Sequence, residues 1–302
     1  MRALLSHRAG GPDTLVLEEI PEPTPEAGQV RINVRAVGVN FPDLLIIQDL
    51  YQSKQQRPFS PGSELAGTID VIGPKVRNLV LGDRVVASPV RGAMAEKVIA
   101  PVCNCWKIPD RMPFDEAAAL LLTYGTSQHA LKDRARLKSG ETLLVLGAGG
   151  GVGLAAVELG KCPAESLDKS AARTLTDAFK AACGPGGAEV ICDTIGGDYT
   201  EAALRAAAWE GRHLVVGFPA GIPNLPLNLP LLKSCQVLGV FWGEFTTRQP
   251  DLHRANVEEL MQLYLAGHIK PAVTERYPLA RGADAIARLG TRQALGKIVV
   301  TL

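Results

Sequence analysis

Residues 143–156 read LLVLGAGGGVGLAA, a short apolar strand followed by a glycine-rich turn and the start of a helix rich in small residues. Glycines let the backbone turn tightly and approach a pyrophosphate without a Cβ in the way, and the free N–H groups at a helix start bind phosphate oxygens. A glycine cluster alone often serves a tight turn, but here the strand and the helix that a dinucleotide site requires are both present. Alanine stands at the first glycine position of the usual pattern. We therefore predict a cofactor turn in which Gly150, Gly151 and Val152 line the pyrophosphate, with Gly153 in the first helical turn.

Strands and helices alternate after this turn. Apolar strands are expected at residues 189–193, 213–217 and 237–242, and a helix at 199–208 connects the first two. Such alternation is typical of a parallel, doubly wound sheet with helices on its faces. We therefore expect an α/β Rossmann domain over residues 123–266.

The first third of the chain has a different pattern. Residues 29–37 alternate apolar and polar side chains, and the further short apolar runs before residue 101 are separated by glycine, proline and aspartate. Short strands with frequent turns are typical of a partly open β-barrel. The last strand, 297–302, has the same character. We expect a β domain of residues 1–122 that is completed by residues 267–302.

The composition restricts the classes of function. The 302 residues contain 32 Lys and Arg against 31 Asp and Glu, and aromatic residues make up 5%. Phosphate-backbone binding needs a basic excess and single-strand binding needs aromatic platforms, so no nucleic-acid partner is expected. No stretch of about 18 apolar residues is present, and the N-terminus lacks the apolar core of a signal peptide, so we expect a cytoplasmic protein without a membrane partner. The six cysteines lack zinc-site spacing, which favours reduced thiols.

One part of the Rossmann pattern is missing. A second and a third strand should precede the fourth, but a helix over about 171–183 already leads into the strand at residue 189. Two strands of about five residues and a crossover of at least 10–12 come to roughly 25 residues with turns. Their loss would expose the edge of the first strand. We therefore predict that a disordered stretch of the protein is absent from this sequence between Lys161 and Cys162. The end of the second strand, which would distinguish NAD from NADP, is then not visible.

Several short motifs follow one another along nearly the whole chain. They are GGPDTL at 10–15, GVNFPD at 38–43, PGSELAG at 61–67, GDRV at 82–85, VVG at 215–217 and GK at 296–297. In their order and spacing they resemble the zinc-free quinone oxidoreductases, related to zeta-crystallin, within the medium-chain dehydrogenase/reductase superfamily. The resemblance implies a GroES-like catalytic domain joined to a Rossmann domain, with NADPH in the cleft. It also implies hydride transfer to a quinone or another conjugated carbonyl compound.

No metal is expected. Zinc alcohol dehydrogenases of the superfamily carry a cysteine ligand where this chain has Asn40 and a histidine ligand where it has Ser63. An amide and a hydroxyl cannot replace a thiolate and an imidazole on zinc. Without a metal as Lewis acid, hydrogen-bond donors near the acceptor would stabilise the charge left on its oxygen.

The resemblance gives three catalytic candidates, Asn40, Asp43 and Tyr51, near the nicotinamide and the substrate. Asp43 has an alternative role as a capping or structural carboxylate, and Tyr51 has one as a loop aromatic at the rim of the site. No residue stands out as an indispensable general acid or base. Residues 52–57 are more polar than is usual in the family, which puts the shape and polarity of the substrate entrance in question.

The resemblance also gives further cofactor candidates, at the domain junction, at strand ends and near the C-terminus: Thr126, Gly217, Phe218, Phe241, Trp242 and Lys297. Ligands of open α/β sheets bind at the carboxyl ends of the strands. Phe241 and Trp242 have an alternative role in sheet packing or in a homodimer, because dimers of the superfamily often join through this edge strand.

The leading function is therefore an NADPH:quinone oxidoreductase. A reductase of enals, enones or enoyl thioesters is the neighbouring alternative. A non-enzymatic role, structural or RNA-binding as in crystallin relatives, is the alternative from another class, and the neutral charge and few aromatic residues weigh against RNA.

Overall fold

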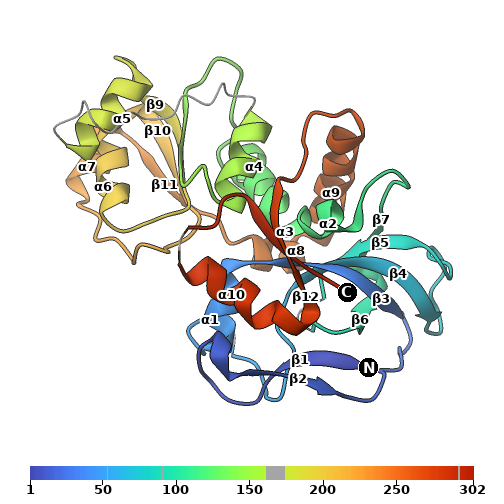
Figure 1. The fold of residues 1–302 in the computed structure, drawn as a ribbon. Coiled ribbons are helices and arrows are strands. Elements are labelled where there is room, and N and C mark those ends of the chain that lie inside the picture. Colours follow the sequence, from blue (N-terminus) through green and yellow to red (C-terminus); the bar gives the residue numbers. More distant parts are fainter. Residues whose placement is uncertain (53, 90–91, 161–173, 292) are drawn as a thin grey trace. The chain divides into compact units, whose positions relative to one another are not determined.

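A computed structural model places most of the chain, which divides into two units. Unit 1 comprises Met1–Leu122 and Lys270–Leu302, and unit 2 comprises Thr123–Ile269. Figure 1 colours them along the sequence, so that unit 1 contains both the blue and the red ends of the chain. The description covers all residues except 53, 90–91, 161–173 and 292.

The sheet of unit 1 is organised around β3 (Gln29–Val39), the strand whose side chains alternate. Residues Val30, Ile32 and Val34 face the core and are at most 2% exposed. The sheet order is β12-β13-β3-β4-β5-β7, with β6 also on β3, and β1 and β2 form a separate antiparallel pair. The strand bounds are Arg2–Ser6 (β1), Leu15–Glu19 (β2), Glu64–Ile72 (β4), Arg84–Ala87 (β5), Lys97–Pro101 (β6), Cys105–Lys107 (β7), Val273–Pro278 (β12) and Lys297–Thr301 (β13).

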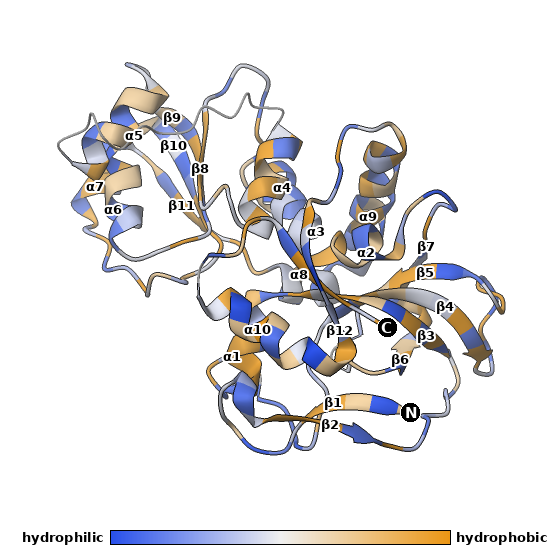
Figure 2. Ribbon diagram, in the orientation of Figure 1, coloured by the Kyte–Doolittle hydropathy of each residue, from blue (hydrophilic) through white to orange (hydrophobic). Residues whose placement is uncertain are grey.

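The C-terminal strand completes this sheet because β13 pairs antiparallel with the end of β3, Ile298 opposite Val39. Three α-helices pack on unit 1: α1 (Phe41–Ile47), α2 (Phe114–Ala118) and α10 (Gly282–Gly290). In Figure 2, α10 carries both hydrophilic and hydrophobic colours along its length, as expected of a helix with one buried face. Short 3₁₀ turns lie at Pro12–Thr14, Val102–Asn104 and Leu279–Arg281.

Unit 2 contains a parallel sheet in the order β11-β10-β9-β8. In the Rossmann numbering these four strands correspond to the sixth, fifth, fourth and first. Among the described residues β8 is therefore an edge strand, and the predicted gap at Lys161 and Cys162 lies outside those residues. The strand bounds are Leu143–Leu146 (β8), Ala188–Asp193 (β9), Ala207–Val215 (β10) and Gln236–Gly239 (β11).

Some elements of unit 2 end before the residue that the sequence predicts. The helix predicted to reach residue 208 ends at Arg205, because β10 already begins at Ala207. The strand predicted to reach residue 242 ends at Gly239, because Trp242 begins a helix. The α-helices are Leu121–Gln128 (α3, across the unit boundary), Gly151–Gly160 (α4), Leu175–Cys183 (α5), Asp198–Arg205 (α6), Asn228–Lys233 (α7), Trp242–Arg248 (α8) and Pro250–Leu265 (α9), and a π-helical turn covers His129–Arg134.

None of the helices in the described part of the chain has the length and apolar character that a membrane span needs.

Candidate active site

The glycine turn of unit 2 lies between β8 and α4, as predicted. The backbone N–H of Gly150 donates to the carbonyl of Gly147 at 3.0 Å, and that of Leu154 donates to Gly150 at 2.8 Å, which makes Gly150 the first acceptor of α4. Helix N–H groups that precede the first helical bond have no partner within the helix. Gly151, Val152 and Gly153 therefore begin α4 with N–H groups available to an anion.

The glycines of this turn serve two different purposes. A Cβ on Gly153 would lie 2.1 Å from the carbonyl oxygen of Gly147, so the fold itself requires glycine there. Gly147 has φ +80°, a left-handed conformation that glycine adopts without strain. A Cβ on exposed Gly150 would meet nothing closer than 3.5 Å, so the fold does not require glycine at that position. Open space beside free N–H groups is the arrangement that a pyrophosphate needs.

The other predicted cofactor residues of unit 2 differ in exposure. Thr126 is buried on α3, next to Ser127, whose hydroxyl donates to the carbonyl of Val152 at 2.7 Å and so ties α3 to the start of α4. Gly217 and Phe218 follow the end of β10, as predicted, and Phe218 is 42% exposed.

Trp242 and Phe241 differ in the role that their surroundings favour, which is either packing or contact with a ligand. A Cβ on Gly125 would lie 2.8–3.0 Å from the Trp242 indole, so this ring packs directly on α3. Trp242 also meets His253 edge to face at 5.4 Å. These contacts favour packing for Trp242. Phe241 is 51% exposed and remains available to a ligand or a partner.

Sequence reasoning missed Asp193, at the carboxyl end of β9. Its Oδ1 accepts the N–H groups of Ile195 and Gly196 at 2.9 Å, and its Oδ2 accepts the Thr200 hydroxyl at 2.5 Å. Burial acts to raise the pKa of Asp193, but hydrogen bonds from buried His213 and from these groups prevail and lower it. Asp193 therefore fixes the turn that follows β9, next to the predicted cofactor turn in the sheet order. The sequence feature that could have revealed Asp193 is a single acidic residue at the end of an apolar strand.

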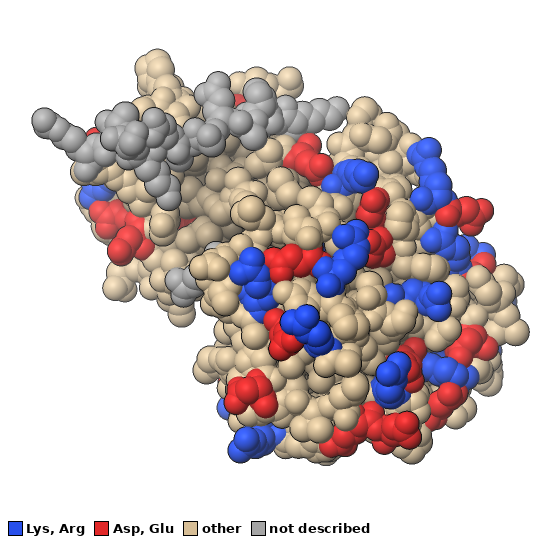
Figure 3. All heavy atoms as spheres, in the orientation of Figure 1, with Lys and Arg blue, Asp and Glu red and all other residues tan. Residues whose placement is uncertain are grey.

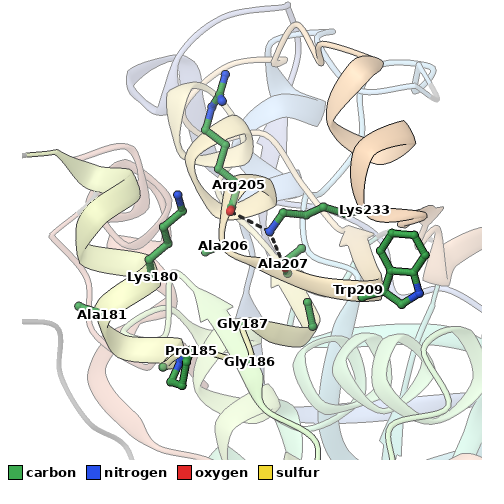
Figure 4. A pocket seen from close by; sticks show the side chains of 12 residues that line it. Lys180, Ala181, Pro185, Gly186, Gly187, Arg205, Ala206, Ala207, Trp209 and Lys233 are labelled. Atoms are coloured by element: carbon green, nitrogen blue, oxygen red, sulfur yellow. Dashed lines mark hydrogen bonds between the residues drawn. The ribbon is translucent and has the colours of Figure 1, made fainter.

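A hollow of about 620 Å³ lies at the other end of the same sheet, near the starts of β9 and β10 (Figure 4). Its basic lining residues stand in the last turns of α5, α6 and α7, where cations interact favourably with the free carbonyls. The Lys233 ammonium, for example, donates to the carbonyls of Arg205 and Ala207. Because ligands of open α/β sheets bind at the carboxyl ends of the strands, this hollow is not the cofactor site.

Unit 1 gathers a buried polar cluster from three distant parts of the chain. Asn40 follows β3, Glu64 begins β4 and Lys297 begins β13, and all three are at most 5% exposed. The Glu64 Oε1 accepts from the Lys297 ammonium at 2.6 Å and from the Asn40 amide at 2.8 Å. Its Oε2 accepts from the backbone N–H of Leu122 at 2.9 Å. The Lys297 ammonium also donates to the Asn40 Oδ1.

This cluster explains Gly38 in the GVNFPD motif. A Cβ on Gly38 would lie 2.1 Å from the carbonyl of Ala118 and 2.5 Å from the Glu64 Oε1. Gly38 is also the register partner of Glu64 in the β3–β4 pair. Glycine therefore lets the carboxylate lie against the strand. The cluster engages both side-chain ends of Asn40 and the ammonium of Lys297 within unit 1.

Asp43 lies in the first turn of α1, and the capping role considered for it is confirmed. Its Oδ2 accepts the backbone N–H of Asn40 at 2.8 Å, across the start of the helix. Its Oδ1 is buried and has no hydrogen-bond partner among the described residues. Burial, reinforced by the charge of Glu64, raises the pKa of Asp43 to about 7, although the N–H groups of Asn40 and Gly62 and the charge of Lys297 act to lower it.

Tyr51, four residues beyond α1, is half-buried. Burial, and after it the negative charge on Asp43, raises the pKa of the Tyr51 hydroxyl. Of the residues predicted as catalytic, the structure thus brings Asn40 and Asp43 into direct contact. Glu64 is a member of the cluster that the sequence did not single out, although it is the one charged residue in the stretch PGSELAG.

The fold and the turn define an α/β dinucleotide-binding protein with a GroES-like β domain. The alcohol dehydrogenase GroES-like domain model matches residues 26–110, and the zinc-binding dehydrogenase model matches residues 167–300. The bovine quinone oxidoreductase-like protein 2 is 35% identical over 311 residues, which cover 95% of this chain and 89% of the relative. The chain belongs to the quinone oxidoreductase-like family of the medium-chain dehydrogenase/reductase superfamily.

Solved structures agree with this assignment. A mycobacterial protein complexed with NADPH has a TM-score of 0.90 and 27% identity, and the match covers 100% of both chains. The CurK enoyl reductase has a TM-score of 0.86 and 26% identity, and the match covers 99% of both chains.

The alignment with the bovine relative also bears on the predicted missing stretch. It spans 311 positions, whereas 95% of this chain is about 287 residues, so about 24 of the positions have no residue here. That length agrees with the roughly 25 residues expected for two strands and their crossover.

Proposed function

We propose that this protein is an NADPH-dependent oxidoreductase that reduces a quinone or a related conjugated carbonyl compound. The observation that carries the proposal is the turn between β8 and α4. Gly150 faces open space there, although the fold does not require glycine at that position. The neighbour complexed with NADPH supports this form of the cofactor. The names of the relatives support a quinone as the acceptor.

The residues of the turn fit a dinucleotide. The N–H groups that begin α4 would hold the pyrophosphate, and Thr126, Gly217, Phe218 and Phe241 are the further candidates for contact with the cofactor. When bound, the cofactor supplies two electrons and one hydrogen to the acceptor. The chain's part is then to orient the two reactants, to exclude water and to stabilise the negative charge that develops on the acceptor's oxygen.

An acceptor panel tests this function. We expect purified protein to oxidise NADPH when a simple quinone such as phenanthrenequinone is added. The likeness to an enoyl reductase keeps alkenals and acryloyl thioesters as the second candidates. Turnover of those compounds without turnover of quinones would move the protein to that class. Bound NADPH with no turnover of any acceptor would favour the non-enzymatic alternative.

The surface charge weighs against nucleic acid as a partner in that alternative. On the face in Figure 3, acidic and basic side chains lie beside one another. The ion pairs of unit 1 include Arg276 with Asp115 and Arg288 with Glu275. A nucleic-acid surface would need a continuous basic stripe.

We also propose that catalysis needs no metal. The Asn40 amide is bonded to Lys297 and Glu64, so a zinc ion at that position would have to displace an ammonium group. Within the part of the chain that the structure describes, no group of three or more His, Cys, Asp and Glu side chains could hold a metal. We expect full activity after dialysis against a chelator. Stoichiometric zinc in protein purified without added metal, with activity lost on its removal, would contradict this.

We propose a homodimer formed through the edge strand β11. Val237 on this strand is 42% exposed, and Leu231 and Leu232 on the preceding helix α7 are 78% and 68% exposed. Apolar surface beside an unpaired strand edge is typical of an interface. We expect Val237→Lys to convert a dimer to a monomer in sedimentation. The matched control is Val80→Lys, at a residue of unit 1 that is 58% exposed. A wild-type monomer at micromolar concentration would contradict the proposal.

A further inference from the structure

Asp193 stands at the carboxyl end of the middle strand of three. In the register of the parallel sheet it is the partner of Leu146, the last residue of β8, and of Val215, the last residue of β10. The segment that follows Asp193 therefore begins between the glycine turn, which follows β8, and the loop that follows β10.

The Asp193 carboxylate meets four donors although it is almost completely buried. Its side chain is 4% exposed. One oxygen accepts the N–H groups of Ile195 and Gly196, both at 2.9 Å. The other accepts the Thr200 hydroxyl at 2.5 Å and faces the His213 Nε2 at 3.3 Å. The Nδ1 of His213 has no partner among the described residues, so its ring is devoted to Asp193 within them. Donors on both oxygens stabilise the charged form and fix the direction of each oxygen.

The turn after Asp193 lies directly against the start of the glycine turn. The Thr194 hydroxyl donates to the carbonyl of Leu146 at 2.7 Å. A Cβ on Gly147 would lie 2.6 Å from the Thr194 Oγ1 and 2.7 Å from the Ile195 Cδ1. The two turns are therefore in contact without space between them, and a shift of residues 194 and 195 would displace Gly147.

The same turn also holds the loop at 217–221, which contains two of the cofactor candidates. The backbone N–H of Ala220 donates to the carbonyl of Ile195 at 2.9 Å, and that of Gly197 donates to the carbonyl of Gly221 at 2.7 Å. These two bonds tie the loop to the residues whose N–H groups Asp193 binds or immediately precedes. The position of the loop therefore depends on the same carboxylate.

We propose that Asp193 is a positioning residue for the cofactor, which holds the glycine turn and the loop at 217–221 in one preassembled arrangement. The proposal rests on the NADPH cofactor of the proposed function and is independent of the acceptor that is reduced. A protein that binds its ligand only in the ordered arrangement has an apparent Kd that rises in inverse proportion to the ordered fraction. Asp193 thus acts on cofactor affinity through the backbone of two segments.

Asp193→Asn tests this effect on affinity. The amide has the size of the carboxylate, but its NH₂ end cannot accept from the donors on one side. If the ordered fraction falls to about one tenth, the Kd for NADPH rises about tenfold. Thr200→Val removes one of the four donors with little change of size and should raise the Kd by a smaller factor. It also serves as the test if Asp193→Asn does not fold. A wild-type Kd for NADPH in the folded variants would overturn the proposal.

Glu141→Gln is the matched control. Glu141 precedes β8 at the opposite end of the same sheet and pairs at 2.5 Å with Arg212, the residue before His213 on β10. The same change of acid to amide there should lower the melting temperature and leave the Kd for NADPH as in the wild type. A rise in Kd equal to that of Asp193→Asn would mean that any loss of stability weakens binding, which contradicts the proposal.

Hydrogen exchange of single amides, measured without cofactor, separates positioning from general stability. The Gly150 amide reports the glycine turn, the Ala220 amide reports the loop, and the Val190 amide, bonded to the carbonyl before β8, reports the opposite end of the sheet. In Asp193→Asn the first two should exchange faster and the third as in the wild type, because the opening is local. Equal acceleration at all three would overturn the proposal. A wild type with this exchange pattern in its variant but no affinity for NADPH would instead refute the proposed function.

Discussion

Replacement of Gly150 by valine is expected to abolish NADPH binding and to leave the fold unchanged. A Cβ at this position would come no closer than 3.5 Å to the rest of the chain, and the backbone is not in the left-handed region, so the folded state tolerates a side chain. The branched side chain would occupy the space beside the N–H groups that begin α4. A phosphate could then no longer approach those groups.

Fluorescence titration with NADPH measures the effect, which we expect to be a loss of at least about 100-fold in affinity, or about 2.7 kcal/mol. Gly186→Val is the matched control, because Gly186 also has open space and an ordinary φ but lies at the opposite end of the sheet. It should bind NADPH like the wild type. If Gly150→Val melts with the wild type and binds NADPH equally well, the turn is not the phosphate site.

Replacement of Lys297 by methionine is expected to destabilise unit 1 severely. The side chain of Lys297 is 5% exposed and that of Glu64 is 1% exposed, so the variant leaves a negative charge in the core without its cation. Removal of one partner of a buried ion pair costs about 3–5 kcal/mol. For a unit of this size, such a loss lowers the melting temperature by roughly 10 °C.

Two further variants separate charge from packing. Lys107→Met removes a cation from an exposed pair with Asp83, in which the lysine side chain is 53% exposed, and should cost less than about 1 kcal/mol. Glu64→Gln combined with Lys297→Met removes the unpaired charge and should recover part of the lost stability. Equal melting temperatures of Lys297→Met and Lys107→Met would show that loss of the buried cation costs no more stability than loss of the exposed one, which contradicts the prediction.

Local patterns were sufficient to predict several strands in each unit. The alternation at residues 29–37 identified β3, and the glycine turn placed β8 and α4, because period-two alternation and strand–turn–helix order depend on nearby residues. The family resemblance was confirmed by the comparisons. Shorter elements were missed, among them α8, which begins at Trp242 where a strand was expected to end. Its start depends on the packing of the indole against Gly125, which is far away in the sequence.

The polar cluster could be predicted only in part for the same reason. Asn40 and Lys297 were named as separate candidates from motifs that stand 257 residues apart. Their contact follows from the pairing of β13 with β3, which no local pattern gives. A sequence can indicate which residues are chemically suitable for a site. The pairing of distant strands decides which of them form ion pairs and hydrogen bonds with one another.

The most direct test of the central claim is a single-turnover measurement with NADPH deuterated at the transferred position of C4. On addition of phenanthrenequinone we predict that protein-bound NADPH is consumed, and that the deuterated cofactor is consumed severalfold more slowly because the C4 bond breaks in the step that is measured. NADPH that binds at the turn yet persists with quinones, enals and enoyl thioesters alike would contradict the assignment of this protein as a reductase.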